Sequence, residues 1–322
     1  MKNILVILLV LFAAPVLADK KLADEKQLSV GILLYPNVQI IDYTGPYEIF
    51  GWAGYKVTTV TEDGKPVLTN MSMKVVPDYS FKNAPQFDVL LIPGGDHHKA
   101  MHNKATLAWI KSQSSAQTIL SVCTGAFILA ETGLLDNLSA TTFYPSLRNF
   151  KKDYPKINTI TNKRFVDNGK IITAAGLSSG IDAALHAVAE HQGIEKAKSI
   201  AMKVEYDWQP EHGFVRGNMA DAQLQSIGGA LPKQLKFDEI HSYGSESEWH
   251  MAFKVTAKQA LTISDLSKSL SDAMALTKEW MPKQGQPNAW YKKSASGENW
   301  LLNLAYTQGK ESLQVALHLH RE

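Results

Sequence analysis

Cysteine is almost absent from this chain: Cys123 is the single one among 322 residues. One thiol cannot form an intramolecular disulfide, and a lone cysteine is most often a small buried apolar residue. Cys123, however, stands between a short apolar run, Thr118–Val122, and a helical pattern around Phe127. A strand-to-helix turn this tight can hold a nucleophile above a parallel sheet, and a helix N-terminus lowers a thiol pKa. Two interpretations of Cys123 therefore remain: a small buried apolar residue, and a nucleophile whose pKa is lowered.

A strong charge of either sign is also lacking. The chain has 33 Lys and Arg residues against 31 Asp and Glu residues, a formal net charge of +2, without a long basic run. Domains that bind nucleic acid carry a basic patch or stripe, and surface-bound membrane helices carry a basic face. We therefore predict neither a nucleic acid nor a membrane as partner of the mature chain.

Long apolar runs are lacking except near the N-terminus. Lys2 is followed by the apolar run Ile4–Ala14 and by the small-residue site Val16–Ala18. This order is typical of a secretory signal peptide, and the run is too short to span a bilayer comfortably. No cysteine follows the cleavage site that could carry a lipid anchor. We predict that residues 1–18 are a signal peptide and that the mature chain is secreted, most simply to the periplasm.

Residues 28–209 alternate apolar runs with helical patterns, which is typical of an α/β domain. Leu28–Leu34 is almost continuously apolar, as expected of a strand covered on both faces of a parallel sheet. We predict further strands at Tyr55–Thr61, Asp88–Ile92, Thr118–Val122 and Ser139–Thr142, a hairpin of Arg164–Asp167 with Lys170–Thr173, and helices at Tyr47–Trp52, Ile181–Glu190 and Ile194–Val204.

Functional groups follow two of these strands. Asp42 lies among apolar residues just after the first strand, and Gly94 and Gly95 follow Asp88–Ile92. In a parallel sheet these positions share an edge with Cys123. Desolvation there would raise the pKa of Asp42 so that it could pass a proton, although Asp is also a common helix N-cap. Paired glycines let backbone N–H groups approach a ligand closely, or simply make a turn.

Four segments between Leu28 and Glu205 resemble the ThiJ/PfpI superfamily, the class I glutamine amidotransferase-like fold. In chain order they are LLYPNVQIIDYTGPYEIF, LLIPGG, VCTGAFILAETGLL and TAAGLSSGIDAALH. The closest resemblance is to isocyanide hydratases and to the sensor domains of GlxA-like regulators. It implies a flavodoxin-like parallel-sheet sandwich with a nucleophile elbow and no cofactor. Relatives commonly dimerise, so a homodimer is a candidate assembly, although the sequence itself does not specify the oligomeric state.

The resemblance also implies roles for individual residues. Cys123 is the catalytic nucleophile and Asp42 is its acid/base partner. Gly94, Gly95 and the N–H of Thr124 form the oxyanion and substrate-binding site, with the Gly95 and Thr124 amides as the two donors.

Phe143 marks a departure from much of the superfamily. Many members have a histidine immediately after the strand that ends here at Thr142, whereas this chain has Phe143 and then Tyr144, which could bind substrate or wall the pocket. Without that imidazole the usual Cys-His-acid triad of amide hydrolysis cannot be built. The resemblance therefore favours a cysteine-dependent hydratase or lyase acting on a small isocyanide or carbonyl electrophile. The alternative is a non-catalytic ligand-binding or redox sensor whose Cys123 is oxidised to a sulfinic acid.

Histidines are grouped in two places, yet ligand spacing typical of a metal site is lacking. His97, His98 and His102 lie within six positions, but no cluster of carboxylates or cysteine accompanies them. His318 and His320 share one strand face, which we interpret as an exposed polar face. We therefore predict no metal site.

The remainder of the chain differs in pattern from residues 28–209. Residues 210–232 are punctuated by Gly and Pro and predict a linker. In residues 233–322, apolar side chains alternate over Trp249–Val255, recur at helical spacing over Ile263–Met274, and alternate again in Glu298–Leu304 and Leu313–Leu319 around a turn. We predict a small α+β domain of unknown role, a candidate for binding a partner or covering the active site.

Overall fold

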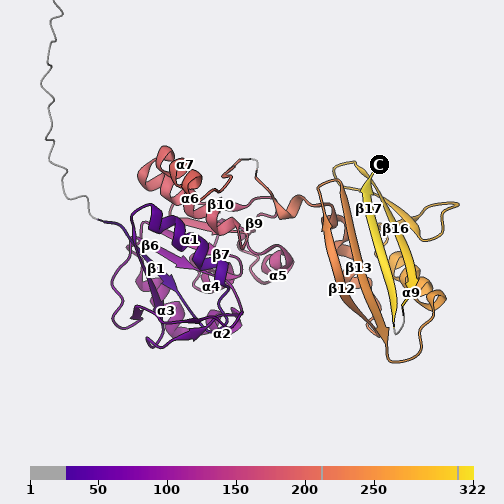
Figure 1. Ribbon diagram of the computed structural model, residues 1–322, viewed down its shortest axis with the longest axis horizontal. Helices are drawn as coiled ribbons and strands as arrows, with labels where there is room; N and C mark the ends of the chain where they lie inside the picture. Colours follow the sequence, from indigo (N-terminus) through magenta and orange to yellow (C-terminus); the bar gives the residue numbers. More distant parts are fainter. Residues whose placement is uncertain (1–26, 212, 310–311) are drawn as a thin grey trace, which may run out of the picture.

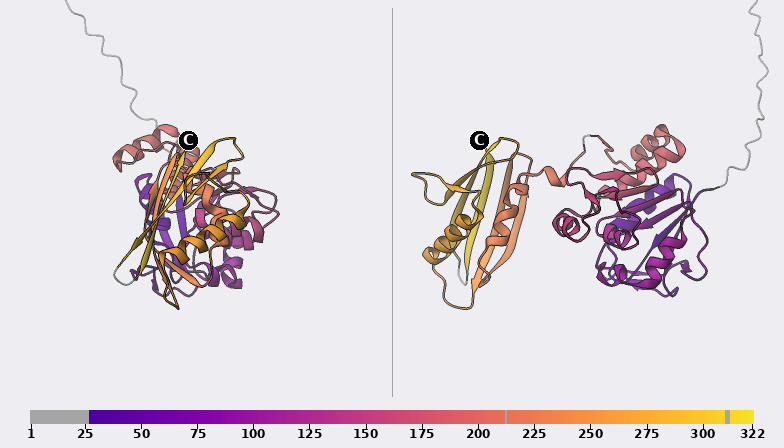
Figure 2. Two further views of the ribbon diagram at one scale, coloured as in Figure 1. Left: turned by 90° about the vertical axis from the view of Figure 1, so that its right-hand side faces the viewer. Right: turned by 180° about the vertical axis from the view of Figure 1, so that it is seen from behind.

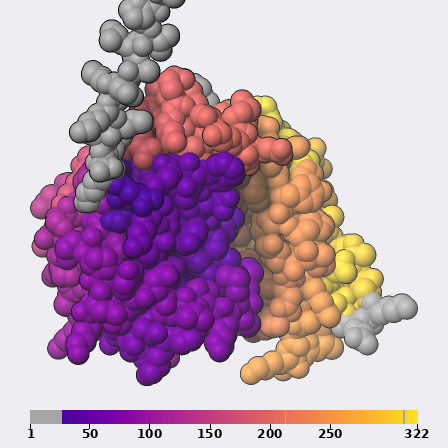
Figure 3. Space-filling model, turned by 60° about the vertical axis from the view of Figure 1, so that its left-hand side comes forward, coloured from indigo at the N-terminus to yellow at the C-terminus, as the bar shows by residue number. Residues whose placement is uncertain are grey.

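The computed structural model describes residues 27–322 except 212, 310 and 311, so the predicted signal peptide lies outside the described residues. The chain forms an N-terminal domain built on a mainly parallel sheet and a C-terminal domain built on an antiparallel sheet (Figures 1 and 2). A recess separates the two where they lie side by side (Figure 3). No helix within the described ranges is both long and apolar enough to cross a bilayer.

The N-terminal sheet has the strand order β10-β11-β7-β6-β1-β2-β5 in the described part of the chain. All its neighbours pair in parallel except β10 and β11, which form the predicted hairpin. The strands are β1 Ser29–Leu33, β2 Lys56–Thr61, β5 Tyr79–Ser80, β6 Val89–Ile92, β7 Thr118–Val122, β10 Phe165–Asp167 and β11 Ile171–Ala174. The flavodoxin-like sheet predicted for this region is confirmed.

Helices cover both faces of this sheet, which explains why β1, β6 and β7 are almost continuously apolar (Figure 1). One layer contains α1 Ile40–Trp52, α6 Ser179–Gln192 and α7 Ile194–Lys203, which pack on one another. The other contains α2 His98–Met101, α3 Lys104–Ser112 and α4 Gly125–Glu131. Smaller elements lie at the periphery: β3 Val67–Leu68, β4 Lys74–Val75, β8 Ser139–Ala140, η1 Tyr144–Ser146, α5 Leu147–Asp153 and β9 Asn158–Thr159.

Two predicted elements differ from the observed ones. The predicted strand Ser139–Thr142 is only the two-residue β8, which pairs with β9 in a separate small sheet. Helix α1 begins at Ile40 rather than at Tyr47, although Gly45 and Pro46 lie within it. Tertiary packing explains the longer helix, because Pro46 is buried and its ring lies against α6 near Gly180.

The C-terminal sheet is antiparallel throughout, with the order β12-β13-β17-β16-β15-β14. Helix α9, Ile263–Thr277, packs on one face and begins with a capping box of Thr262 and Asp265. The predicted strand, helix and hairpin of this region are all present. The pattern had not indicated β12, β14 or β15. The strands are β12 Leu235–Gly244, β13 Glu248–Ala257, β14 Met281–Pro282, β15 Ala289–Lys293, β16 Asn299–Gln308 and β17 Leu313–Arg321.

The predicted linker is partly folded. It contains η2 Arg216–Asn218, η3 Ala220–Leu224 and α8 Gln225–Ala230. Met219 and Ala220 are buried in a cluster of the C-terminal domain with Trp249. The second half of the predicted linker therefore packs as part of the C-terminal domain.

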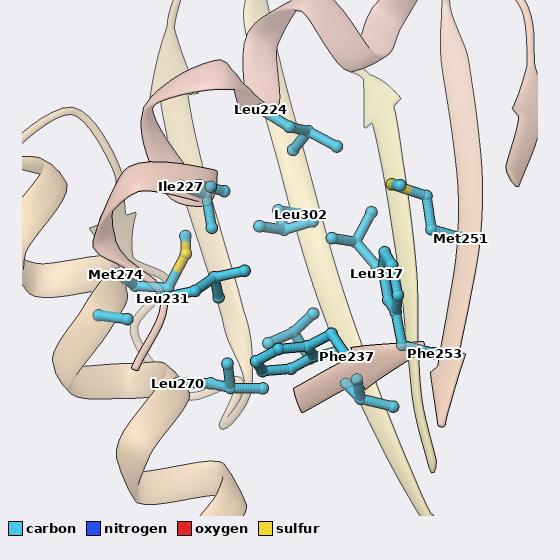
Figure 4. Close-up of a pocket in the computed structure, with 14 residues that line it drawn as sticks. Leu224, Ile227, Leu231, Phe237, Met251, Phe253, Leu270, Met274, Leu302 and Leu317 are labelled. Atoms are coloured by element: carbon cyan, nitrogen blue, oxygen red, sulfur yellow. The ribbon is translucent and has the colours of Figure 1, made fainter. Parts of the chain in front are cut away.

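The core of the C-terminal domain is hollow where the helices meet the sheet (Figure 4). A cavity of about 170 Å³ lies there between two separate apolar clusters. Ile227 from α8 and Leu270 and Met274 from α9 face Met251 and Leu302 of the sheet across it. Protein interiors are normally close-packed, so this cavity marks incomplete packing of the helices on the sheet.

Candidate active site

Four loops meet at the carboxyl edge of neighbouring parallel strands. Asp42 lies after β1, Gly94 and Gly95 after β6, Cys123 after β7 and Leu177 after β11, and these four strands are adjacent in the sheet. Ligand sites of open α/β sheets form at this edge because the loops there converge. The structure thus brings together the residues that the sequence predicted as nucleophile, acid/base and glycine turn.

Cys123 occupies a strained elbow between β7 and α4. Its φ of 58° lies in the left-handed region, which a non-glycine residue adopts only when its surroundings hold it there. The Cys123 N–H donates to the Ala174 carbonyl over 3.1 Å, and the Thr142 hydroxyl donates to the Cys123 carbonyl over 2.8 Å. A Cβ on Gly125 would lie 2.1 Å from the Ile92 carbonyl oxygen, so the start of α4 packs very closely against the end of β6. The predicted nucleophile elbow is present.

Asp42 is fully buried and its carboxylate is oriented by groups outside its own helix. Oδ2 accepts from the Gly94 N–H and Oδ1 from the Leu177 N–H, each over 3.1 Å, and the carboxylate also hydrogen-bonds to Cys123. The N-cap position of α1 belongs to Gln39, so the N-cap interpretation of Asp42 is wrong. Leu177, whose φ is 53°, was not predicted as part of the site, because a backbone donor leaves no side-chain signal.

The electrostatics of the pair differ from the expectation for Cys123. Burial raises the pKa of Asp42 to about 6. Hydrogen bonds from Leu177, Cys123 and Gly94 act in the opposite direction and lower this pKa, but burial has the larger effect. Burial, followed by repulsion from the Asp42 carboxylate, raises the pKa of the Cys123 thiol, opposed by a hydrogen bond from the Thr124 N–H. The predicted lowering of the Cys123 pKa is therefore wrong. Helix α4 has only seven residues, and the stabilisation of a thiolate by its N-terminus does not outweigh burial beside a carboxylate. With the Asp42 pKa near 6 and the Cys123 pKa raised, the pair carries one proton at neutral pH.

This shared proton predicts an unusual pH profile for alkylation of Cys123 by iodoacetamide. We expect the rate to rise through pH about 6, as the pair loses its first proton, and to reach a plateau set by the fraction in which sulfur is the ionised partner. A second rise in the alkylation rate follows only at a pH above the range in which cysteine thiols usually ionise. In Asp42→Asn the lower step should disappear. One step at the pH of an ordinary thiol in the wild-type protein would contradict the shared proton.

The structure corrects the role predicted for Gly95. Its N–H donates to the Thr124 hydroxyl over 3.0 Å, and that hydroxyl lies 3.0 Å from the Gly95 carbonyl, to which it donates. The Gly95 amide is therefore engaged and does not face a substrate as an oxyanion donor, whereas the Thr124 N–H lies against the Cys123 sulfur. A Cβ on Gly94 would lie 2.6 Å from the Thr124 N and 2.8 Å from Asp42 Oδ2. The two glycines serve to position Asp42 and Thr124.

Phe143 and Tyr144 form a wall beside the elbow. A Cβ on Gly176 would lie 3.2 Å from the Phe143 ring and 3.3 Å from Cys123 Cβ, so the apolar ring stands next to the nucleophile. Both aromatic residues line a cavity of about 260 Å³ that also includes Gly176 and Leu177. Arg216 lies over the Tyr144 ring at 4.4 Å from its centroid. Tyr144 therefore lines this cavity, and its contact with a substrate stays a prediction.

Arg216 connects this wall to the C-terminal domain. Its guanidinium lies 4.7 Å from the centroid of the Trp249 ring as well as over Tyr144, and it forms a two-pronged ion pair with Asp221 at 2.6 Å. Gln225 adds a hydrogen bond of 3.3 Å to the Tyr144 hydroxyl. The C-terminal domain thus contacts the lining of the pocket through a few side chains.

Of the three histidines grouped near the glycine turn, His97 makes its contacts with residues other than Cys123. His97 is buried, and its Nδ1 lies 3.3 Å from the Gly95 carbonyl. Its ring stacks on His98 and lies tilted against Phe127. Burial lowers the pKa of His97. The imidazole is held by the glycine turn and by aromatic neighbours.

Comparison with known proteins agrees with this arrangement. Isonitrile hydratase of Pseudomonas putida is 34% identical over 183 residues, 56% of this chain and 78% of that protein. The HTH-type transcriptional regulator GbdR of Pseudomonas aeruginosa is 24% identical over 187 residues, and the chain spans 51% of that regulator's length.

Solved structures agree on the fold. A ThiJ/PfpI family protein from Pseudomonas syringae superimposes with a TM-score of 0.56 at 26% identity, covering 78% of this chain and 90% of that one. Drosophila melanogaster DJ-1beta, at 23% identity, shares the fold with a TM-score of 0.52 over 56% of this chain and all of its own. Residues 28–190, a range that includes the elbow, the glycine turn and Asp42, match the DJ-1/PfpI family. The chain belongs to this family.

Proposed function

We propose that this protein is an exported hydratase that adds water to a small isocyanide, with Cys123 as nucleophile and Asp42 as proton donor and acceptor. The observation that supports it most is the buried, hydrogen-bonded pair of these two residues beside the apolar Phe143 ring. The likeness to isonitrile hydratase over most of that protein's length supports the same reaction. A carboxyl group whose pKa is about 6 can both give and take protons near neutral pH.

In the first step the Cys123 sulfur attacks the terminal carbon of the isocyanide R–N≡C, and a new S–C bond forms. The proton that Asp42 holds moves to the same carbon, which gives the covalent thioimidate R–N=CH–S and leaves Asp42 as a carboxylate. The Thr124 N–H, which lies against the sulfur, stabilises the thiolate before attack.

In the second step the attacking water bonds to the thioimidate carbon, and Asp42 takes one proton from this water and passes it to the nitrogen. Asp42 then takes the remaining hydroxyl proton as the C–S bond breaks, which releases the formamide R–NH–CHO. The Cys123 thiolate and the protonated Asp42 are regenerated, so the sum of the steps is the isocyanide plus one water. The hydrogen bonds from Gly94 and Leu177 hold the carboxyl group in one place through both transfers.

Amide hydrolysis fits this arrangement poorly. It needs a base that deprotonates the nucleophile and then protonates a leaving amine, which histidine does near neutral pH. The ring beside Cys123 is that of Phe143, and His97 is held against Gly95 and Phe127 instead.

A substrate panel tests the reaction class. We expect purified protein to convert a small alkyl or aryl isocyanide to the matching formamide, followed by NMR or by loss of the isocyanide infrared band. Glutamine and peptide substrates should remain intact under the same conditions. Peptide cleavage without isocyanide turnover would overturn the proposal.

A sensor role is the second candidate, favoured by the likeness to a transcriptional regulator. A sensor would bind a ligand, or have Cys123 oxidised to a sulfinic acid beside Asp42, without turnover. Absence of turnover with every electrophile of the panel, together with saturable ligand binding or stable oxidation of Cys123, would favour this candidate.

A further inference from the structure

The outer face of the C-terminal sheet carries a group of four titratable side chains on two neighbouring strands. Strands β13 and β17 are antiparallel, and their register places Glu248 opposite His320 and His250 opposite His318. Alternate residues of a strand point to the same face, so these four share the face opposite to the buried Trp249. Glu248 and His250 in β13, and His318 and His320 in β17, thus lie at the four corners of one surface patch, which we call the histidine patch.

The side chains of this patch converge. One ligand atom each from Glu248, His250 and His318 lies within 4.8 Å of the other two. The rings of His250 and His318 stack with centroids 4.4 Å apart, and the His320 ring lies 4.9 Å from that of His318. A search of the described residues for three or more His, Cys, Asp or Glu side chains at such distances finds this group.

Two ring nitrogens in this patch have no hydrogen-bond partner, although they are shielded from solvent. They are His318 Nε2 and His320 Nδ1. An unpartnered polar atom of this kind is costly, and it calls for an explanation such as an ion.

We infer that Glu248, His250 and His318, with His320 as a fourth ligand, form a binding site for a divalent transition-metal cation of the kind that prefers imidazole, such as Zn²⁺. Zn–N bonds of 2.0–2.1 Å require ligand atoms about 3.4 Å apart in a tetrahedral site. Side-chain rotation on the paired strands closes the remaining distance, because the backbone register already holds the four residues together. Three imidazoles and one carboxylate suit Zn²⁺ better than Mg²⁺ or Ca²⁺, which prefer oxygen ligands.

Titration of the chelator-treated full chain with Zn²⁺ by calorimetry tests the site, with Co²⁺ absorption as a report of tetrahedral coordination. We expect one ion per chain and a rise in Tm on addition of Zn²⁺. In the variant His250→Ala/His318→Ala, affinity should fall at least about tenfold and the tetrahedral Co²⁺ bands should be lost. Circular dichroism of this variant without metal shows whether it is folded, and Glu248→Gln provides a milder change of a more exposed ligand.

A matched double variant separates this site from the other histidine group. His98→Ala/His102→Ala removes two imidazoles of the N-terminal domain and should leave Zn²⁺ affinity, the Co²⁺ spectrum and the Tm shift unchanged. Equal Zn²⁺ affinity in wild type and His250→Ala/His318→Ala would overturn the inference. So would loss of binding in the His98→Ala/His102→Ala variant alone, or no binding by the wild-type chain.

Discussion

Replacing Cys123 with serine is expected to abolish isocyanide hydration, with kcat/KM falling by at least about 10,000-fold. The two side chains are nearly isosteric, but a hydroxyl is far less acidic than a thiol, and Asp42 cannot ionise it at neutral pH. Initial rates of formamide production by equal amounts of wild type and variant measure the effect.

The matched control is His98→Ala, which alters a neighbouring ring outside the cysteine pair and should keep its activity. Cys123 is the only cysteine, so thiol titration of Cys123→Ser should read zero and exclude contamination by wild-type protein. Substantial turnover by Cys123→Ser would mean that sulfur does not form the covalent intermediate.

Asp42→Asn is expected to lower kcat/KM by about 100- to 10,000-fold, because both proton transfers lose their carrier while the nucleophile remains. The variant should also have a distinctive stability profile. The folded-state pKa of Asp42 is raised from 3.8 to about 6, so its stabilising contribution is fully present below pH 3.8 and is lost as the pH rises through about 6. Relative to wild type, the variant should therefore gain on the order of 3 kcal/mol in unfolding free energy between pH 4 and pH 8.

Denaturant unfolding at those two pH values checks the stability profile of Asp42→Asn. The comparison between pH values cancels the constant cost of placing an amide beside the Gly94 and Leu177 N–H groups. An unfolding difference independent of pH would show that Asp42 does not titrate in this range. Full hydratase activity in the same variant would remove Asp42 from the mechanism.

Much of the N-terminal domain could be predicted because its signals are local. Thr118–Val122 is a strand in both prediction and structure, and the sharp change of pattern at Cys123 indicates the elbow. The place of Asp42 follows from the rule that loops of a parallel sheet converge at one edge. Phe143 was expected near Cys123 from the resemblance alone, and the structure places it there.

The parts that were not predicted depend on contacts between distant backbone groups. That the Gly95 N–H bonds to the Thr124 hydroxyl cannot be read from a Gly-Gly pair, because the same pair can also face a ligand. The Leu177 donor has no side-chain signature. The pKa of Cys123 was predicted in the wrong direction because burial of the elbow, rather than the short helix after it, decides the sign.

The histidine patch illustrates the same limit in the C-terminal domain. His318 and His320 alone are compatible with an exposed polar face. Only the register of β13 against β17 brings Glu248 and His250 beside them. Strand register over a long sequence separation is not written in either segment by itself.

The burial of the Cys123 side chain bears on which molecules can react with its sulfur. Only 6% of Cys123 is accessible, and the aromatic wall stands beside it. Disulfide exchange depends on the access of one sulfur to another. We therefore expect compact electrophiles to react with this thiol faster than thiols carried by large molecules, and we expect two copies of the chain to resist crosslinking through their single sulfur.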